Sequence, residues 1–289
     1  MNRFCIITNR GKDKDLAITN KVVDYLRKNG KFVHITEESG GDDGIGFTDA
    51  DTLPEGMECA VVIGGDGTIL QASHDLAGLD IPLMGINMGT VGFLAETEIA
   101  NLVYAFDDLF ANRFTVEKHI MLNGTIYKMQ DDGTYKKLRP RIALNDAACT
   151  RAGFSRIVSF TVFVNGEFMN NYKGDGVIIA TPTGSTGYSL SAGGPICAPN
   201  AEGLLITPVC PHSFLARSIV IPASSKITIK VDMSRKTQQK EASVTMDGDM
   251  ISEMGAGDYI EIERSEVTTG IIKFKSTGFF QLLRTKLGD

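Results

Sequence analysis

Two glycine-rich runs, about 110 residues apart, each place a carboxylate among residues with almost no side chain. The first is Gly64-Gly65-Asp66-Gly67-Thr68, and the second is Gly174-Asp175-Gly176 followed by a hydroxyl-rich run over residues 181–195. Glycine lets backbone N–H groups approach a ligand closely. Backbone amides at turns and helix starts bind anions, so phosphates are the expected ligands. The two runs predict one site built from two distant parts of the chain.

The first run lies where open α/β sheets usually bind ligands. An apolar stretch at residues 59–63 predicts a buried strand, and residues 68–76 predict a helix directly after the run. A phosphate held by the run would therefore be within reach of Asp66. A tight turn in which Asp66 only caps the helix is the alternative. The run is neither a Walker A loop nor the dinucleotide fingerprint. The predicted phosphate contacts are Gly64, Gly65, Gly67 and Thr68.

Two neighbouring polar residues, Asn145 and Asp146, follow a predicted strand at residues 142–144. An adjacent amide and carboxylate supply donors and acceptors for a vicinal diol, as on a ribose. An Asx turn is the other interpretation of the pair. Asp175 could likewise accept a hydrogen bond from an amide group. The second half of the chain thus carries candidate groups for a ribose and for an amide.

Three further side chains could contact a nucleotide, and each has a plainer alternative. Lys173 and Arg156 are candidate phosphate contacts or ordinary surface charges, and Tyr188 could stack on a base or pack in the protein. Residues 181–195 have the composition of a linker. Because apolar runs flank them, we interpret them instead as a ligand-binding loop.

Composition excludes several classes of protein. The chain has 289 residues, 43% of them apolar and 22% charged, which suits one large or two ordinary globular domains. A net charge of -6 argues against broad binding to nucleic acid or anionic membranes. Five scattered cysteines and four histidines without ligand spacing argue against a disulfide framework and a permanent metal site. With no signal peptide and no apolar run of transmembrane length, a cytoplasmic protein is expected.

The order of predicted elements indicates an α/β domain with a mainly parallel sheet over residues 1–113. Thr97 is a possible N-cap of its last helix. The predicted strands lie at residues 4–8, 31–36, 59–63 and 81–87, and the predicted helices at residues 14–29, 68–76 and 99–110.

From residue 114 to 269 the chain changes to short β-branched segments separated by turn residues, which predicts an all-β domain. Asn165-Gly166 between two such segments predicts a two-residue hairpin. A helix is expected there only from Tyr188 or Ser189 onward. The tail, residues 270–289, could rejoin the first domain.

Taken together, these motifs resemble those of the NAD kinases. The Gly-Gly-Asp-Gly-Thr run is shared with diacylglycerol, sphingosine and phosphofructo-kinases, whereas the run over residues 181–195 is specific. Residues 89–94 and the Asn145-Asp146 pair also resemble the family, and the similarity extends over residues 4–280. It implies transfer of a phosphoryl group from ATP, with Mg2+, to the 2′-hydroxyl of the adenosine ribose of NAD. It also implies a site between the two domains and homodimers or homotetramers.

The resemblance implies roles for individual residues. Asp66 would accept the proton of the 2′-hydroxyl, and Asp175 would bind the nicotinamide carboxamide. Asn145 and Asp146 would bind ribose, with Phe93 packed on a ring. Further NAD contacts are expected at Gly67, Arg156, Lys173, Thr186, Gly187, Tyr188, Ser189, Leu190, Ser191 and Asp249, and Asp247 is a possible further site residue.

Two positions depart from the family's usual pattern. The family usually has Glu where this chain has Asp146, so the carboxylate reaches about one methylene less, and it usually has Ala where this chain has Gly187. Other functions also fit parts of the sequence. A lipid or sphingoid kinase would need an apolar acceptor groove, and a silent dinucleotide-binding sensor would bind without turnover. Polyphosphate as donor and NADH as acceptor stay open.

Overall fold

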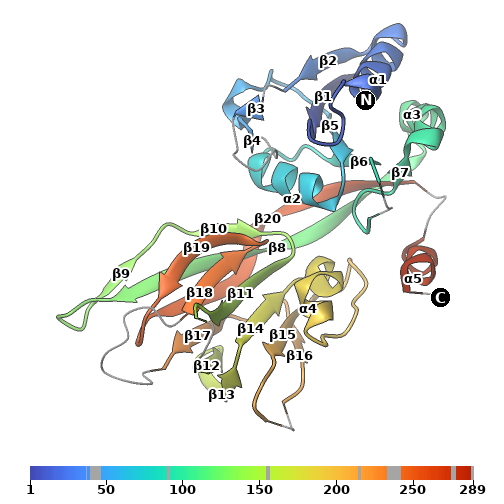
Figure 1. The fold of residues 1–289 in the computed structure, drawn as a ribbon. Coiled ribbons are helices and arrows are strands. Elements are labelled where there is room, and N and C mark those ends of the chain that lie inside the picture. Colours follow the sequence, from blue (N-terminus) through green and yellow to red (C-terminus); the bar gives the residue numbers. More distant parts are fainter. Residues whose placement is uncertain are drawn as a thin grey trace. The chain divides into compact units, whose positions relative to one another are not determined.

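The computed structural model of the chain divides into two compact units (Figure 1). The first comprises Met1–His119 and Thr268–Asp289, and the second Ile120–Val267. Two long strands, β8 (Phe114–Met129) and β20 (Tyr259–Phe274), run from one unit into the other. The structure describes residues 1–36, 38–39, 47–89, 92–153, 157–213, 216–232, 242–274 and 278–287.

Parallel strands form the sheet of the first unit, in the order β2–β1–β5–β6. Three of them are continuous buried runs, the usual pattern of strands covered on both faces. The end of β20 continues the sheet in parallel, with Ile271 opposite Leu83. The predicted parallel sheet is therefore confirmed. The strands are β1 (Arg3–Thr8), β2 (Phe32–Ile35), β5 (Cys59–Gly64) and β6 (Leu83–Asn87), with the short β3 (Glu38–Ser39), β4 (Phe47–Thr48) and β7 (Thr97–Glu98).

The helices of the first unit follow the predicted order but differ at their starts. The first begins at Ala17 instead of residue 14, because the Asp13 carboxylate accepts the amides of Ile18 and Thr19 and holds the preceding residues in a turn. The predicted N-cap Thr97 is wrong, since it lies in β7 and a 3-10 turn comes before the helix. The helical segments are α1 (Ala17–Lys28), η1 (Ala50–Thr52), α2 (Asp66–Asp75), η2 (Ile99–Asn101), α3 (Leu102–Phe110) and α5 (Phe279–Leu287).

The second unit is built from antiparallel strands, as predicted. One set runs in the order β13–β12–β17–β20 and the other in the order β16–β15–β14–β11–β18–β19. Alternate residues of both sets meet in one apolar core that includes Phe160, Ile229, Ile179 and Ile206. The strands are β9 (Tyr135–Lys137), β10 (Arg141–Ala143), β11 (Asp146–Arg151), β12 (Val158–Val164), β13 (Glu167–Gly174), β14 (Gly176–Ala180), β15 (Gly203–Val209), β16 (Ile219–Pro222), β17 (Ile227–Val231), β18 (Ala242–Met246) and β19 (Asp249–Met254).

The local predictions for the second unit also agree with the structure. Asn165 and Gly166, with φ of 52° and 83°, join β12 to β13 as a two-residue hairpin. The predicted helix is the single turn α4 (Tyr188–Ser191), which follows the 3-10 turn η3 (Thr183–Thr186). No helix in the described ranges is long and apolar enough to cross a membrane.

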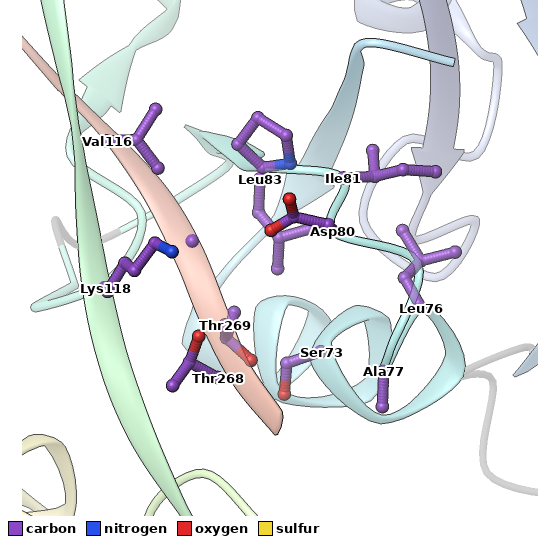
Figure 2. Close-up of a pocket in the computed structure, with 12 residues that line it drawn as sticks. Ser73, Leu76, Ala77, Asp80, Ile81, Leu83, Val116, Lys118, Thr268 and Thr269 are labelled. Atoms are coloured by element: carbon purple, nitrogen blue, oxygen red, sulfur yellow. The ribbon is translucent and has the colours of Figure 1, made fainter. Parts of the chain in front are cut away.

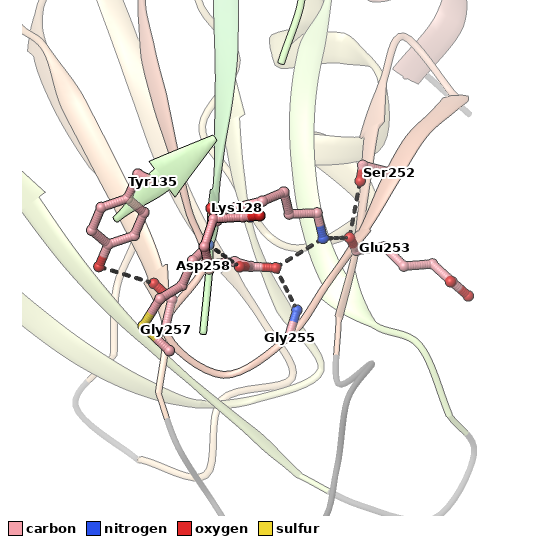
Figure 3. Close-up of polar contacts among 9 residues, drawn as sticks. Lys128, Tyr135, Ser252, Glu253, Gly255, Gly257 and Asp258 are labelled. Carbon is pink, nitrogen blue, oxygen red and sulfur yellow. Dashed lines mark hydrogen bonds and ion pairs between the residues drawn. The ribbon is translucent and has the colours of Figure 1, made fainter. Parts of the chain in front are cut away.

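A buried carboxylate ties β8 to the turn before β20 (Figure 3). Asp258 accepts hydrogen bonds at 2.8 Å from the Lys128 ammonium and from the amides of Met129 and Gly255. Lys128 also donates to the carbonyl oxygen of Glu253. These contacts fix the end of one strand against the start of another that is distant in sequence.

Candidate functional site

Asp66 is the first residue of α2 and directly follows β5 and Gly65. Its Oδ2 accepts the amide of Phe93 at 2.8 Å, and its Oδ1 accepts those of Leu94 and Ala95 at 3.2 and 3.1 Å. Asp66 therefore does not act merely as a helix cap. An ionised carboxylate offers about four acceptor positions. The three amides of described residues occupy three of these acceptor positions, which leaves one position on Oδ2 for a ligand hydroxyl.

Gly92 allows this close approach. A Cβ at Gly92 would lie 1.7 Å from Asp66 Oδ1, a separation that no side chain can adopt. The contact links the two motifs over residues 64–68 and 89–94, and it puts Phe93 beside Asp66 through its backbone. Thr90 and Val91 lie outside the described residues.

The glycine run itself is closely packed at two positions. A Cβ at Gly64 would lie 2.2 Å from Thr68 Oγ1, and one at Gly65 would lie 2.8 Å from Lys12 Nζ. Gly67 is exposed, with no atom within 4 Å of its Cβ position. Thr68 is buried, and its hydroxyl accepts the Asn9 side-chain amide at 3.2 Å and the Gly65 amide at 3.4 Å. Gly65 is half-buried and its amide donates to Thr68, so the exposed backbone at Gly67 is the part of the run that a phosphate can approach.

Lys12 is a candidate that sequence reasoning missed. It is exposed and lies in the turn after β1, where its amide donates to the Asn9 carbonyl at 3.0 Å. The Asn9 amide donates in turn to the Ile63 carbonyl at 2.9 Å, so the turn is fastened to the end of β5. The signal was the position of Lys12 after the neighbouring parallel strand, at the same edge of the sheet as Asp66.

The other end of this turn is held by Asp13. Its carboxylate accepts the Thr19 amide at 2.8 Å and the Thr19 hydroxyl at 2.7 Å. Burial alone would raise the pKa of Asp13, but the hydrogen bonds from Thr19, Ile18 and Ala17 outweigh it, and the pKa lies below its ordinary value. Lys12 is therefore presented by a turn that is anchored on both sides.

In the second unit, the hydroxyl-rich run lies against the Asn145-Asp146 pair. Asp146 is opposite Ala180 in the β11–β14 ladder, so the residues that follow β14 necessarily pass Asn145. The Thr181 amide donates to the Asn145 carbonyl at 2.8 Å. A Cβ at Gly187 would lie 3.7 Å from Asn145 Nδ2 and 3.9 Å from Asp146 Oδ2, so both side chains face Gly187.

Asp247 fixes this pair from the opposite side. Its carboxylate accepts the amides of Leu144, Asn145 and Asp146 at 2.6, 2.7 and 2.9 Å. Asp146 is only 6% exposed. Burial, followed by the negative charge of Asp247, raises the pKa of Asp146 to about 7. The sequence signal for Asp247 was the Asp-Gly pair between two apolar β segments, which is typical of a tight hairpin.

Asp175 is paired with a residue that the sequence did not point to. Arg151 Nε lies 2.9 Å from Asp175 Oδ1, with both side chains about one-third exposed. Tyr188 is 44% exposed. Its pKa is raised by burial first and then by the charges of Asp146, Cys210 and Asp175.

The remaining predicted contacts vary in exposure. Ser189 is fully buried, and its hydroxyl bonds to that of Thr207 at 2.9 Å. Thr186 donates to the Thr183 carbonyl at 3.2 Å. Arg156 lies outside the described residues. Lys173, Ser191 and Asp249 are exposed, and Leu190 is half-buried.

A cavity of about 230 Å³ in the first unit involves none of these residues (Figure 2). It is lined by Ser73, Asp80, Lys118 and Thr268 together with apolar side chains such as Leu76. Within the described ranges, no group of three or more His, Cys, Asp or Glu side chains is arranged to hold a metal ion.

The amino-acid sequence is similar to those of known proteins over its whole length. The family models described as the ATP-NAD kinase N-terminal and C-terminal domains match residues 4–114 and 144–274. The chain is 48% identical over 289 residues to an NAD kinase of Lachnoclostridium phytofermentans, with all of both chains covered. It is 41% identical over 293 residues to an NAD kinase of Agathobacter rectalis, covering 100% of this chain and 99% of that protein.

Two crystal structures share the fold. A yeast NADH kinase complexed with NADH superposes with a TM-score of 0.78 at 23% identity, covering 100% of this chain and 88% of that one. An NAD kinase from Archaeoglobus fulgidus in complex with ATP superposes with a TM-score of 0.75 at 24% identity, covering 99% and 98%. The resemblance carried by the sequence motifs is thus confirmed, and the chain belongs to the ATP-NAD kinase family.

Proposed function

We propose that this chain transfers the terminal phosphoryl group of ATP to the 2′-hydroxyl of the adenosine ribose of NAD, with Asp66 as the proton acceptor. One observation carries the proposal. The Asp66 carboxylate is held by three amides at the end of β5, with one acceptor position left for a hydroxyl. Membership of the ATP-NAD kinase family supports NAD as acceptor and ATP as donor.

In the proposed reaction, the 2′-oxygen forms a bond to the terminal phosphorus as the bond to the ADP oxygen breaks. The hydroxyl proton passes to Asp66 Oδ2. Phosphoryl transfer depends mainly on positioning and on neutralisation of charge. The Gly67 amide and the nearby Lys12 ammonium would hold the phosphate oxygens.

Mg2+ would enter as part of the ATP substrate. It neutralises phosphate charge and orients the transferred group when bound. Apart from Asp66, to which the proposal gives the hydroxyl proton, the groups beside the glycine run are backbone N–H donors and an ammonium, which suit phosphate oxygens. We therefore propose that the phosphates and water hold the ion, as Mg2+ prefers.

The second unit would bind NAD. Asn145 and Asp146 would take the diol of a ribose, and Asp175, oriented by Arg151, would accept the carboxamide N–H of nicotinamide. Tyr188 is exposed enough to stack on the adenine. Both sets of residues would act on the same dinucleotide. A cytoplasmic homodimer or homotetramer is part of this proposal.

Purified protein with Mg2+-ATP and NAD should form NADP, followed with an NADP-specific dehydrogenase. Asp66→Asn should lose about 10²–10⁴-fold in kcat, the usual contribution of general-base assistance. Its amide oxygen can still accept the Leu94 and Ala95 amides, but its NH2 group would face the Phe93 amide, so a modest fall in Tm is expected and kcat should be compared at a temperature where the variant is folded and saturated with NAD.

Matched reactions would lack ATP or replace NAD with a sphingoid base or diacylglycerol. Near-full activity of Asp66→Asn would show that another group accepts the proton. NAD binding without any NADP would indicate a silent sensor, and product formed from the lipid would indicate a lipid kinase.

A further inference from the structure

The Asp247-Gly248 turn joins β18 to β19 next to the predicted ribose-binding pair. Met246 pairs with Asp249, so the loop has two residues, and their φ angles are 51° and 93°. Asp-Gly is a favoured sequence for this turn because both residues need positive φ. β18 also pairs with β11, with Met246 opposite Ala147. The turn therefore places Asp247 directly beside Asp146.

The Asp247 side chain does more than the turn requires. A two-residue hairpin needs only backbone geometry, yet this carboxylate accepts three successive amides, those of residues 144–146. Successive N–H groups aimed at one anion fix the local backbone. That backbone directs the Asn145 and Asp146 side chains toward Gly187. Asp247 thus orients the pair without being part of it.

The same contacts bring two carboxylates together at a buried position. Asp247 lies beside Asp146 in the β18–β19 turn, where its carboxylate accepts the Asp146 amide, and the charge of Asp146 contributes to the raised pKa of Tyr188 in α4. Burial and a like charge both disfavour the ionised form of Asp146. An ionised carboxylate accepts both hydroxyl hydrogens of a diol, whereas the protonated form has fewer acceptor positions.

We infer that Asp247 is a positioning residue that fixes the direction of Asp146 and, together with burial, favours its protonated form, so that the affinity of this chain for NAD weakens below neutral pH. The inference rests on the proposed role of Asp146 in binding ribose. With Asp146 titrating at about 7, roughly one-tenth of it is ionised at pH 6 and nine-tenths at pH 8. The apparent Kd of NAD should then be about tenfold higher at pH 6 than at pH 8.

Two variants at position 247 separate charge from geometry. Asn and Gly both suit positive φ, so each keeps the turn. Asp247→Asn keeps an oxygen for the Asn145 and Asp146 amides but removes the charge. Because burial, the larger cause of the raised pKa of Asp146, is still present in this variant, its ratio of Kd at pH 6 to Kd at pH 8 should fall below the tenfold of wild type without disappearing. Asp247→Gly removes both the accepting oxygens and the charge, and its Kd for NAD at pH 8 should be at least about tenfold above that of wild type.

Calorimetric titration of NAD into the full chain from pH 5.5 to 8.5 would measure these values. Asp146→Asn should bind weakly with no pH dependence, and Asp131→Asn, at an exposed turn, should match wild type. Carbon-13 NMR of carboxyl-labelled aspartate gives a readout independent of NAD. The resonance absent from Asp146→Asn should titrate near pH 7 and shift to lower pH in Asp247→Asn.

A wild-type Kd equal at pH 6 and pH 8 would overturn the inference. So would a pH dependence that survives in Asp146→Asn or is unchanged in Asp247→Asn. NADP formation at pH 8 by the same preparation would still support the proposed function in each case. No NADP at any pH would instead overturn the proposed function.

Discussion

The Lys12 side chain places a positive charge beside the glycine run, which itself contains no basic residue. The run has no Walker lysine, yet the Lys12 ammonium lies close to Gly65. We expect Lys12→Ala to raise the KM for ATP about tenfold, which corresponds to about 1.4 kcal/mol for one charged contact at a partly exposed site. The KM for NAD should change less than about twofold, and steady-state kinetics with each substrate varied would measure both.

The matched control is Lys14→Ala, two residues along the same exposed segment. It changes net charge equally but leaves Lys12 in place. Equal KM changes in both variants would mean that general surface charge, and not contact with phosphate, attracts ATP. Lys12→Arg should recover part of the affinity, because it restores the charge with a different shape.

Single residues differ in how far the sequence could predict them. Asp66 could be placed from local order alone, since a strand, glycines and a helix start define its position. The Arg151–Asp175 pair and the approach of Gly92 to Asp66 could not, because each joins segments distant in sequence. The same holds for the pKa of Asp146, whose rise depends on burial and on Asp247 about a hundred residues later.

Among the elements, the turn before β20 depends on one buried carboxylate. Asp258→Asn would keep the shape but lose the charge that binds Lys128 and two amides. We expect a loss of about 1–3 kcal/mol in unfolding free energy, the usual cost of unsatisfied buried polar groups. Urea unfolding of this variant and of Asp131→Asn would measure it. A loss of activity without loss of stability would contradict this purely structural role.

Element boundaries were harder to predict than element types. The buried runs of β1, β5 and β6 are mainly apolar, so their parallel arrangement could be predicted. The start of α1 depends on Asp13 accepting amides ahead of it, which periodicity does not reveal. The length of β20 could not be predicted from short β-branched segments, because the strand continues to Phe274 through partner strands in both units.

For the whole molecule, each unit carries a chemically different half of the proposed reaction. The first offers a fixed carboxylate, the exposed Gly67 amide and Lys12, which suit a phosphoryl donor and a proton. The second offers a diol-binding pair and an exposed ring, which suit a dinucleotide. The residues proposed to bind the dinucleotide lie in the second unit and those proposed to bind the phosphoryl donor lie in the first, so we expect an isolated unit to have no NAD kinase activity.

Global stability should record the proton on Asp146. The pKa of this group is about 7 in the folded protein, whereas an unfolded chain has about 3.9. Between these values the folded state binds more protons than the unfolded state, so unfolding free energy falls as pH rises from 4 to 7. The side chain of the Asp146→Asn variant is never charged, so its unfolding free energy should rise relative to that of wild type as pH rises from 4 to 7. This difference in unfolding free energy should be small at pH 4 and should reach at most about 4 kcal/mol at pH 8. Scanning calorimetry of both proteins at these pH values would test this, and a difference in Tm that is independent of pH would show that Asp146 is already ionised throughout.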